Sequence, residues 1–493
     1  MNIWIFKRFL RSATLASLAL QAVGQSAQAA PPPISIPAFA DEGAAPVSGS
    51  LFGFVGGMDR SSALLGDMWG LRRALSKSGI SLAVLETSEQ LGNLTGGTRK
   101  GFVYDGLTQI VAQTDTQRAF GHYGGLLNVS FLNLHGSNLS TQNLQSLQTA
   151  SGIQGDRSTR LWEFWFDQKF TEEDRLSLRL GQQSLDQEFM VSGNALYFVN
   201  TMFGWPMLPS ANMPSGGPAY PLSALGVRMS ARPVDGVTLL AGVFNGNPVK
   251  NDNGSDPQTQ NRHGTSFPLN GGRLYIAEAQ FSYPTLGSMV EPGQTKSLGW
   301  TYKIGAWYNS NKASDMALDV NGLSLSDPAS NGNALQHPGN YAFYAVADQL
   351  VWRDDSDPNR TIALFARVMG TPLRDRNLID ASLNVGVLMH SPLHNRPADT
   401  VGVGMGYAHV SPRAAQLDVN SNAFSGTNSP IRSSEKFLEM TYQYQLKPWI
   451  QIQPDVQYVF NPGAGLANPN NPNNPAARIQ NELVVGVRTN ISF

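Results

Sequence analysis

The stretch Glu435–Pro462 constrains the fold more than any other part of this chain, because its apolar and polar side chains alternate with a period of two. In its first half the apolar face carries Leu438, Met440, Tyr442, Tyr444 and Leu446, and the polar face carries Glu439, Thr441, Gln443 and Gln445. In its second half Ile450, Ile452, Val456, Tyr458 and Phe460 oppose Gln451, Gln453, Asp455 and Gln457. Such alternation is typical of β-strands whose two faces meet different surroundings.

The two halves of this stretch predict a hairpin, joined by Lys447-Pro448-Trp449, that places Gln445 opposite Gln451. One face of the hairpin is then a ladder of amides and carboxylates. In a soluble sandwich that face meets bulk water, whereas in a membrane barrel it lines a water-filled lumen and the apolar face meets lipid. Pro454 cannot donate a ladder hydrogen bond, so we expect a local bulge there.

The composition favours the membrane barrel. Only 14% of the 493 residues are charged, against roughly 25% in typical soluble domains. No apolar run after the N-terminus is long enough for a transmembrane helix. The net charge of −1 gives no reason to expect a nucleic-acid partner, and the absence of cysteine excludes disulfides and thiol chemistry.

The N-terminal region predicts export. Lys7, Arg8 and Arg11 precede a short apolar run and a small-x-small site, so residues 1–30 are interpreted as a secretory signal peptide. Residues 31–63 form a linker rich in Pro and Gly. Residues 64–79 predict a short periplasmic helix with Asp67 as its N-cap and Gly79 as its stop.

Residues 80–493 predict a transmembrane β-barrel of about sixteen strands. The strand-like segments begin near Ile80, Phe102, Tyr123, Arg160, Arg175, Ala224, Val237, Arg273, Leu298, Tyr341, Thr361, Leu378, Thr400, Lys436, Trp449 and Ile479. Short turns at Thr171–Asp174, Arg232–Gly236 and Lys447–Trp449 alternate with long links, which are His135–Thr159, Leu185–Ser223, Gly246–Gly272, Ser310–Asn340, Ser411–Glu435 and Asn461–Arg478. This alternation is the pattern of outer-membrane barrels, whose short turns are periplasmic and whose long loops are outside. The fold class is therefore all-β, a sixteen-stranded antiparallel transmembrane barrel with a short N-terminal helix.

Other segments alternate in the same way. In the segment Leu161–Phe170, Trp162, Phe164, Phe166 and Phe170 are expected to face lipid, and Glu163, Trp165, Asp167 and Lys169 the lumen. Around Val401–Tyr407, Gly402, Gly404 and Gly406 leave space on the lumen side. The chain ends in a strand closed by Phe493, and such an ending resembles the signal read by the barrel-assembly machinery.

The connection Leu185–Ser223 is long, apolar and rich in proline. Its aromatic residues include Phe198, Phe203, Trp205 and Tyr220. A loop that only meets water would not carry so many aromatic side chains. We therefore predict that it folds into the barrel as a constriction loop, with a trimer contact or an outer lid as the alternatives.

Several charged and aromatic side chains fall on the lumen face by strand parity. They are Glu163, Trp165, Asp167, Arg179, Arg228, Lys303, Trp307, Arg367, Glu439, Asp455 and Arg488. A ring of both signs beside tryptophans suits a neutral polyhydroxy ligand, because Arg and carboxylates supply forked hydrogen bonds to vicinal hydroxyls. The alternative is that about half of these side chains are simply solvated lumen residues that neutralise one another.

Signals of catalysis or metal binding are weak. The seven histidines include no HExxH, and His390 and His394 flank a predicted turn. The glycines around Gly404 lie on a strand with no helix after it, which excludes a nucleotide fingerprint. We therefore predict no catalytic residues, no metal site and no cofactor.

The chain resembles a known family. The motifs GDMWGLRRALSKSGI, RLWEFWFDQKF, LRLGQQSLDQEF, FGWPMLPSANMPSGGPAYPLSALGVRM and WIQIQPDVQYVFNP, in this order, are similar to those of the carbohydrate-selective porins (the OprB type) of Gram-negative outer membranes. The likeness covers residues 65–493. It implies a sixteen-stranded barrel in the outer-membrane lipid and passive uptake of small sugars such as glucose, with polyols as further candidates. One departure is Gly66-Asp67-Met68-Trp69-Gly70, where the family usually has GDWGG.

Two other classes of function are weighed against this one. A barrel enzyme would need a nucleophile and a base on neighbouring wall positions, and a secreted soluble sugar-binding β-protein would not need alternating loop lengths. A homotrimer is compatible with the sequence but is not specified by it.

Overall fold

The computed structural model describes residues 62–171, 175–250, 255–283 and 298–493. The signal peptide, nearly all of the linker and most of the turn Thr171–Asp174 lie outside these ranges. The strands are β1 Ile80–Thr95, β2 Gly101–Asp115, β3 Gly125–Gly136, β4 Ser158–Lys169, β5 Leu176–Gln183, β6 Ala224–Ala231, β7 Val237–Asn245, β8 Arg273–Tyr283, β9 Trp300–Asp319, β10 Ala334–Arg353, β11 Thr361–Gly370, β12 Ile379–His390, β13 Thr400–Val410, β14 Ser434–Lys447, β15 Ile450–Phe460 and β16 Glu482–Ser492. The α-helices are α2 Leu71–Lys77, α3 Thr116–Phe120, α4 Thr201–Gly204, α5 Met207–Asn212, α6 Pro257–Gln260 and α7 Pro412–Ser425.

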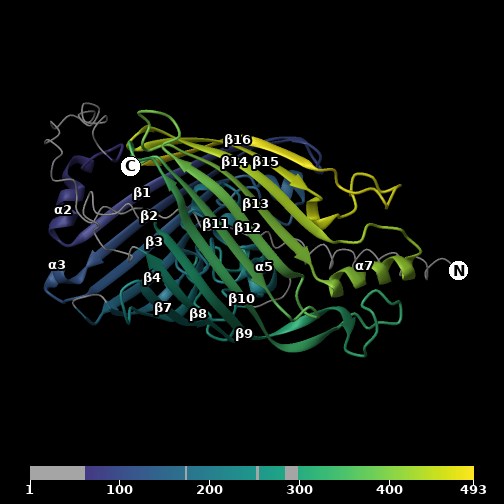
Figure 1. Ribbon diagram of the computed structural model, residues 1–493. Coiled ribbons are helices and arrows are strands. Elements are labelled where there is room, and N and C mark those ends of the chain that lie inside the picture. Colours follow the sequence, from purple (N-terminus) through teal and green to yellow (C-terminus); the bar gives the residue numbers. More distant parts are fainter. Residues whose placement is uncertain (1–61, 172–174, 251–254, 284–297) are drawn as a thin grey trace.

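Within the described ranges, sixteen strands close into one barrel (Figure 1). Each strand pairs antiparallel with its neighbours in the sequence, and β1 closes the ring by pairing with both β2 and β16. The predicted fold class is thus confirmed. A closed barrel leaves no unpaired strand edge, as a bilayer requires of a membrane-spanning sheet.

The alternation in β14 and β15 sorts the side chains by face. Glu439 is fully buried inside the barrel, whereas Met440 beside it is 57% exposed on the outer face. The hairpin pairs Gln445 with Gln451 as predicted. The bulge expected at Pro454 is wrong, because the register between β15 and β16 runs through Pro454 without a shift. Pro454 is exposed on the outer face.

A bulge in β4 changes which of its side chains face the lumen. The register between β3 and β4 shifts so that Phe131 pairs with Leu161 while Ser130 pairs with Glu163. The extra residue, Trp162, turns inward and packs edge-on against Tyr220 at 6.2 Å between ring centroids. The prediction that Trp162 faces lipid is therefore wrong, since a bulge inverts the parity of the residues before it.

Short turns gather at one end of the barrel and long connections at the other (Figure 1). At the short-turn end, the helical segment begins later than residue 64, because Met68 and Trp69 adopt positive φ, and α2 starts at Leu71. Asp67 Oδ1 still accepts the backbone N–H of Arg73, and Gly79, at φ 73°, ends the segment.

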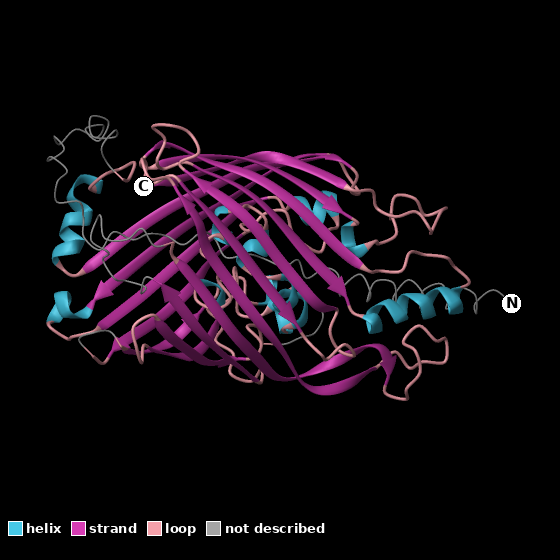
Figure 2. Ribbon diagram, in the orientation of Figure 1, coloured by secondary structure: helices cyan, strands magenta, loops and turns pink. Residues whose placement is uncertain are grey.

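At the long-loop end, the connections are more ordered than the sequence suggested. The link expected over residues 310–340 is mostly strand, because β9 and β10 each continue for 20 residues. Only residues 320–333 remain between these two strands. The link after β13 contains α7, capped by the Ser411 side chain, which accepts the backbone N–H of Ala414. Figure 2 shows α7 beyond the strand ends and other short helices within the ring of strands.

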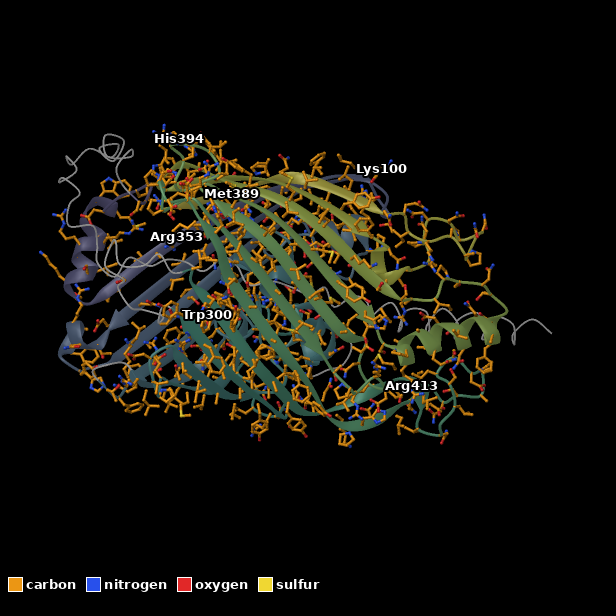
Figure 3. All side chains as sticks on the ribbon, viewed as in Figure 1. Lys100, Trp300, Arg353, Met389, His394 and Arg413 are labelled. Atoms are coloured by element: carbon orange, nitrogen blue, oxygen red, sulfur yellow. The ribbon has the colours of Figure 1, made fainter. Side chains whose placement is uncertain are left out.

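The outer wall is apolar over most of its circumference. Leu180, Val227, Ile304 and Val368 are among its exposed side chains, and Figure 3 shows this coat between Arg353 at one end and Arg413 at the other. None of the described helices is long and apolar enough to cross a membrane.

The outer face of β1–β3 carries a group of polar side chains that the rest of this apolar wall, over its described residues, does not show in the same form. Glu86 accepts hydrogen bonds from Thr108 Oγ1 at 2.5 Å and Ser88 Oγ at 3.1 Å, and its carboxylate lies 3.4 Å from His135 Nε2. Tyr104 Oη is 3.2 Å from the same histidine nitrogen. We call this set the outer polar network.

Candidate functional site

The connection 185–223, here called loop 3, folds into the barrel. The wall holds it by its main chain. Glu439 on β14 accepts the backbone N–H groups of Val199 at 2.6 Å and of Asn200 at 3.0 Å. A carboxylate that accepts two N–H groups makes charge-assisted bonds, which are stronger than neutral ones. Glu439 therefore anchors loop 3 and has no surface to offer to a ligand.

Two further wall residues bind residues 191–194 of loop 3. Asp348 on β10 accepts Ser192 Oγ at 2.6 Å and the N–H groups of Gly193 and Asn194, both at 3.2 Å. Lys303 on β9 donates from Nζ to the carbonyl of Val191 at 2.7 Å. Lys303 was predicted to line the channel, and the structure gives it this tethering contact.

Arg367 on β11 is the centre of the attachment. Its Nη1 donates to the carbonyls of Met190 and Gly204, each at 2.8 Å. Its Nη2 donates to Met202 O, and both Nη2 and Nε reach Asn384 Oδ1. These contacts use all five N–H groups of a guanidinium. Only 1% of Arg367 is exposed, so the predicted sugar donor is enclosed under loop 3.

The four aromatic residues of loop 3 that were expected to form the constriction are also enclosed. Phe198 packs on Phe203 at 4.4 Å between ring centroids, and Phe203 meets Phe437 of β14 edge-on at 5.3 Å. Trp205 Nε1 donates to Gly216 O, and Tyr220 Oη donates to Ile153 O. These rings are buried between loop 3 and the wall and do not face the channel.

Glycines of β13 make room for this core. A Cβ on Gly402 would lie 2.8 Å from Phe198 Cζ, and one on Gly404 would lie 2.6 Å from Phe203 Cζ. Both distances are too short for carbon atoms. The space that these glycines leave inside the barrel is therefore filled by the aromatic rings of loop 3.

A second inward connection, residues 137–157 or loop 2, was not predicted. Glu435 of β14 accepts the N–H groups of Leu147 at 2.8 Å and Gln148 at 2.7 Å. Gly152 N donates to Val199 O at 2.9 Å, which joins loop 2 to loop 3. The sequence of loop 2 carries no Phe, Tyr or Trp, so its composition did not indicate burial.

The structure brings together four of the predicted lumen residues at the base of loop 3. Asp167 Oδ2 accepts Arg179 Nε and Arg228 Nη2, each at 2.9 Å. The guanidinium of Arg179 lies 3.9 Å above the centroid of Trp165. Glu188 of loop 3 completes the group, 2.8 Å from Arg228 Nε and 3.7 Å from Arg179 Nη1. We call these five residues the charged rim.

Exposure separates the members of the charged rim. The side chains of Arg179 and Glu188 are 18% and 26% exposed, whereas that of Arg228 is 3% exposed. Arg179 and Glu188 can therefore meet a solute, while Asp167 holds Arg179 and Arg228 holds Glu188. Glu188 was missed by the sequence argument, although a lone glutamate in an apolar loop opposite an arginine-bearing wall was a usable signal.

The other predicted residues do not join the charged rim. Glu163 is buried and accepts Ser184 N at 3.0 Å. Trp307 is 2% exposed and lies in the apolar core. Asp455 is buried and accepts Gln457 Nε2 at 2.8 Å. Arg488 donates from Nε to Glu89 at 2.5 Å. Each of these four side chains is buried and supports the protein structure.

Asp186 closes the base of loop 3. It accepts Ser184 Oγ at 2.6 Å and Tyr220 N at 2.8 Å, and so ties the start of the loop to its end. Burial raises the pKa of Asp186 to about 6 from an ordinary value of 3.8, even though these hydrogen bonds favour the carboxylate.

Comparison with known families assigns this architecture. The description "Carbohydrate-selective porin, OprB family" matches residues 99–493. The chain belongs to this family. It is therefore an outer-membrane porin for carbohydrates, a channel protein of the Gram-negative outer membrane.

Individual relatives of this porin agree. It is 23% identical to Porin B of Pseudomonas aeruginosa over 454 residues, which cover 88% of this chain and 92% of the relative. It is 21% identical to the putative porin QuiX of Acinetobacter baylyi over 422 residues, 81% and 88% of the two chains. The high-pH structure of Pseudomonas putida OprB superposes with a TM-score of 0.75 at 24% identity, over 88% of this chain and 99% of that one. This likeness supports the fold.

Proposed function

We propose that this porin passes monosaccharides such as glucose, and polyols of similar size, between loop 3 and the barrel wall at the charged rim. The observation that carries the proposal is the pairing of Arg179 with Glu188, two partly exposed side chains of opposite sign at the base of a loop that is otherwise sealed against the wall. A guanidinium donates to vicinal hydroxyls and a carboxylate accepts from them, so a neutral polyol is matched without a net charge.

Passive transport needs only weak binding at such a rim, strong enough to favour entry and weak enough to permit release. Because Asp167 holds Arg179 and is itself bound by Arg228, the rim is organised before the sugar arrives. No cofactor or energy source is part of this mechanism.

Planar-bilayer recording tests the proposal. Each hydrogen bond to a charged group contributes about 1.5–3 kcal/mol before desolvation is offset. Arg179→Ala should weaken block of the open channel by glucose about tenfold or more and change its conductance little. Arg374→Ala is the matched control, since Arg374 is a well-exposed arginine paired with Asp380 at the long-loop end. Equal glucose block in wild type and Arg179→Ala would overturn the assignment of the rim.

Two partner predictions belong with this proposal. Recognition by the barrel-assembly machinery is expected at Phe493, whose backbone N–H donates to Val84 O at 2.9 Å.

The homotrimer stays a prediction, and the outer polar network is the face that favours it, because Glu86 and His135 face outward where hydrocarbon solvates ionisable groups poorly. Chemical cross-linking in detergent decides this: a monomer band alone would exclude the trimer.

A further inference from the structure

The amide ladder that first marked this sequence takes no part in the charged rim. Register places its members in two rows on the inner face of the barrel, toward the short-turn end. His390, Thr400 and Gln443 lie on one pairing line. The second line holds Gln445, Gln451, Asn490 and Thr87. These side chains lie on six neighbouring strands, β12–β16 and β1, and so form one continuous inner surface.

A chain of hydrogen bonds runs along the second row and joins it to Gln443 of the first. Gln451 Nε2 donates to Gln443 Oε1 at 3.2 Å, Asn490 Nδ2 donates to Gln451 Oε1 at 3.0 Å, and Thr87 Oγ1 donates to Asn490 Oδ1 at 2.8 Å. These bonds orient the amides, while Gln443, Gln451 and Asn490 remain only half-buried. An oriented amide that is still accessible can both donate to and accept from a ligand hydroxyl.

Tyr197 of loop 3 stands over this surface. Its carbonyl accepts Gln443 Nε2 at 3.1 Å and Gln453 Nε2 at 2.8 Å. Its ring meets the His390 ring edge-on at 5.1 Å between centroids. Unlike Phe198 next to it, Tyr197 is only partly buried, and within the described part of the chain its hydroxyl has no hydrogen-bond partner. The Tyr197 backbone is thus held by the wall, and its side chain packs against the apolar core and His390 while remaining partly exposed.

The chemistry of this surface selects a class of ligand. It offers amide donors and acceptors, a hydroxyl and an aromatic face, without an ion pair among the residues just named. An aromatic face covers the C–H side of a sugar ring, and paired amides match its hydroxyls. An ionised solute would lose hydration here without meeting an opposite charge.

We propose that Tyr197 and the amides of Gln443, Gln451 and Asn490 form a second subsite for a neutral sugar or polyol, on the short-turn side of loop 3 and separate from the charged rim. This inference rests on the proposed function, since it assumes that sugars reach the barrel interior. The amides of this subsite lie on β14–β16, whereas the wall residues of the charged rim lie on β4–β6, so the two sites would bind a sugar on different parts of the wall.

Cysteine protection tests occupancy of the subsite directly, because the chain has no cysteine of its own. Asn490→Cys in detergent-solubilised, folded protein is treated with a small methanethiosulfonate reagent, with and without glucose or xylitol. At a sugar concentration four times Kd, the fraction of empty sites and hence the modification rate should fall about fivefold. Gln113→Cys is the control, an inward amide on β2 in the same half of the barrel.

Tyr197→Ala in the Asn490→Cys chain should abolish this protection, and Tyr197→Phe should retain most of it. The alanine variant should keep the loop in place, because the hydrogen bonds from the wall reach the backbone carbonyl of Tyr197, which alanine retains. Heat-modifiable migration on gels checks its fold. Sugar block of the wild-type channel with no protection at position 490 would overturn the subsite and leave the proposed function intact. Absence of sugar block in the wild type would overturn the proposed function itself.

Discussion

At the scale of single residues, the wall side chains divide into those that hold a loop and those that can meet a sugar. Strand parity identified both groups as inward-facing, and it could not separate them, because separation depends on where loop 3 lies. Arg367 and Arg179 have the same parity. One is enclosed with all its donors used, and the other is 18% exposed beside Glu188.

Arg367→Ala should therefore alter the loop rather than sugar recognition alone. It removes the donors to the carbonyls of Met190, Met202 and Gly204. Leaving such buried acceptors unpaired destabilises by about 1–3 kcal/mol each. We expect a lower midpoint of heat-induced unfolding and a larger, noisier conductance. A variant with wild-type conductance and stability would contradict the anchoring role.

Asp186 gives a pH dependence with a defined sign. Its pKa is about 6 in the folded chain and has an ordinary value of 3.8. Between these values the unfolded chain binds fewer protons at this carboxyl than the folded chain, so the free energy of unfolding falls as the pH rises from about 4 to about 6.

Asp186→Asn should flatten this part of the pH profile, measured as the midpoint of urea unfolding in lipid. Asparagine can still accept Tyr220 N and can donate to Ser184 Oγ, so the loop base is retained. Asp355→Asn, on an exposed turn, serves as the control. An unchanged slope in the Asp186→Asn variant would assign the pH dependence to other groups.

Phe164 and Glu163 test the two faces of one strand. Phe164 is 47% exposed on the outer wall, and Glu163 is 8% exposed inside. Phe164→Arg should destabilise the barrel by about 2–4 kcal/mol near the bilayer midplane. Glu163→Gln keeps an acceptor for Ser184 N and should leave folding intact. Equal folding defects in the two variants would show that the outward placement of Phe164 is wrong.

At the scale of elements, loop 3 is fastened at successive points by β8–β15. Asp348→Ala should free residues 192–194, since Asp348 accepts from all three. The expected result is faster flicker of the open channel and higher conductance, with the strands unaffected. Asp355→Ala is the matched acidic control. Identical current traces for the Asp348 variant and wild type would mean that this segment does not border the conducting path.

Most strand starts were predictable because each depends on local alternation and turn residues. Thr361 and Thr400 begin β11 and β13 at the predicted positions. Misplacements occurred where a long-range contact overrides the local pattern. Trp162 turns inward at a bulge to meet Tyr220, and β10 begins at Ala334 rather than Tyr341, because it pairs with an equally extended β9.

The candidate site was less predictable than the fold. The sequence indicated that loop 3 folds inward, but the direction in which its aromatic rings point depends on glycines of a distant strand, such as Gly404. The importance of Glu188 follows from its distance to Arg228, which no local pattern contains.

At the scale of the whole molecule, the two ends of the barrel differ in loop length. Because outer-membrane barrels have long outer loops and short periplasmic turns, we expect the long-loop end to be extracellular. Asn331→Cys, between β9 and β10, should react with an impermeant thiol reagent on intact cells. Asp235→Cys, in the turn between β6 and β7, should react only after lysis. Both side chains are exposed. If only position 235 were labelled on intact cells, the short-turn end would be extracellular and the expected topology would be wrong.

Because the wall holds loop 3 mainly by its backbone, the side chains of the loop can change while the loop stays attached. Glu439, Asp348 and Arg367 bind mainly backbone N–H and C=O groups, which every amino acid other than proline supplies in full. Mutations at the partly exposed positions between Gln187 and Tyr197 can thus alter solute preference while the tethers stay engaged. A library randomised at Gln187, Val191 and Leu196 should yield many folded channels with altered selectivity, which makes this barrel a tolerant scaffold for engineering new permeation properties.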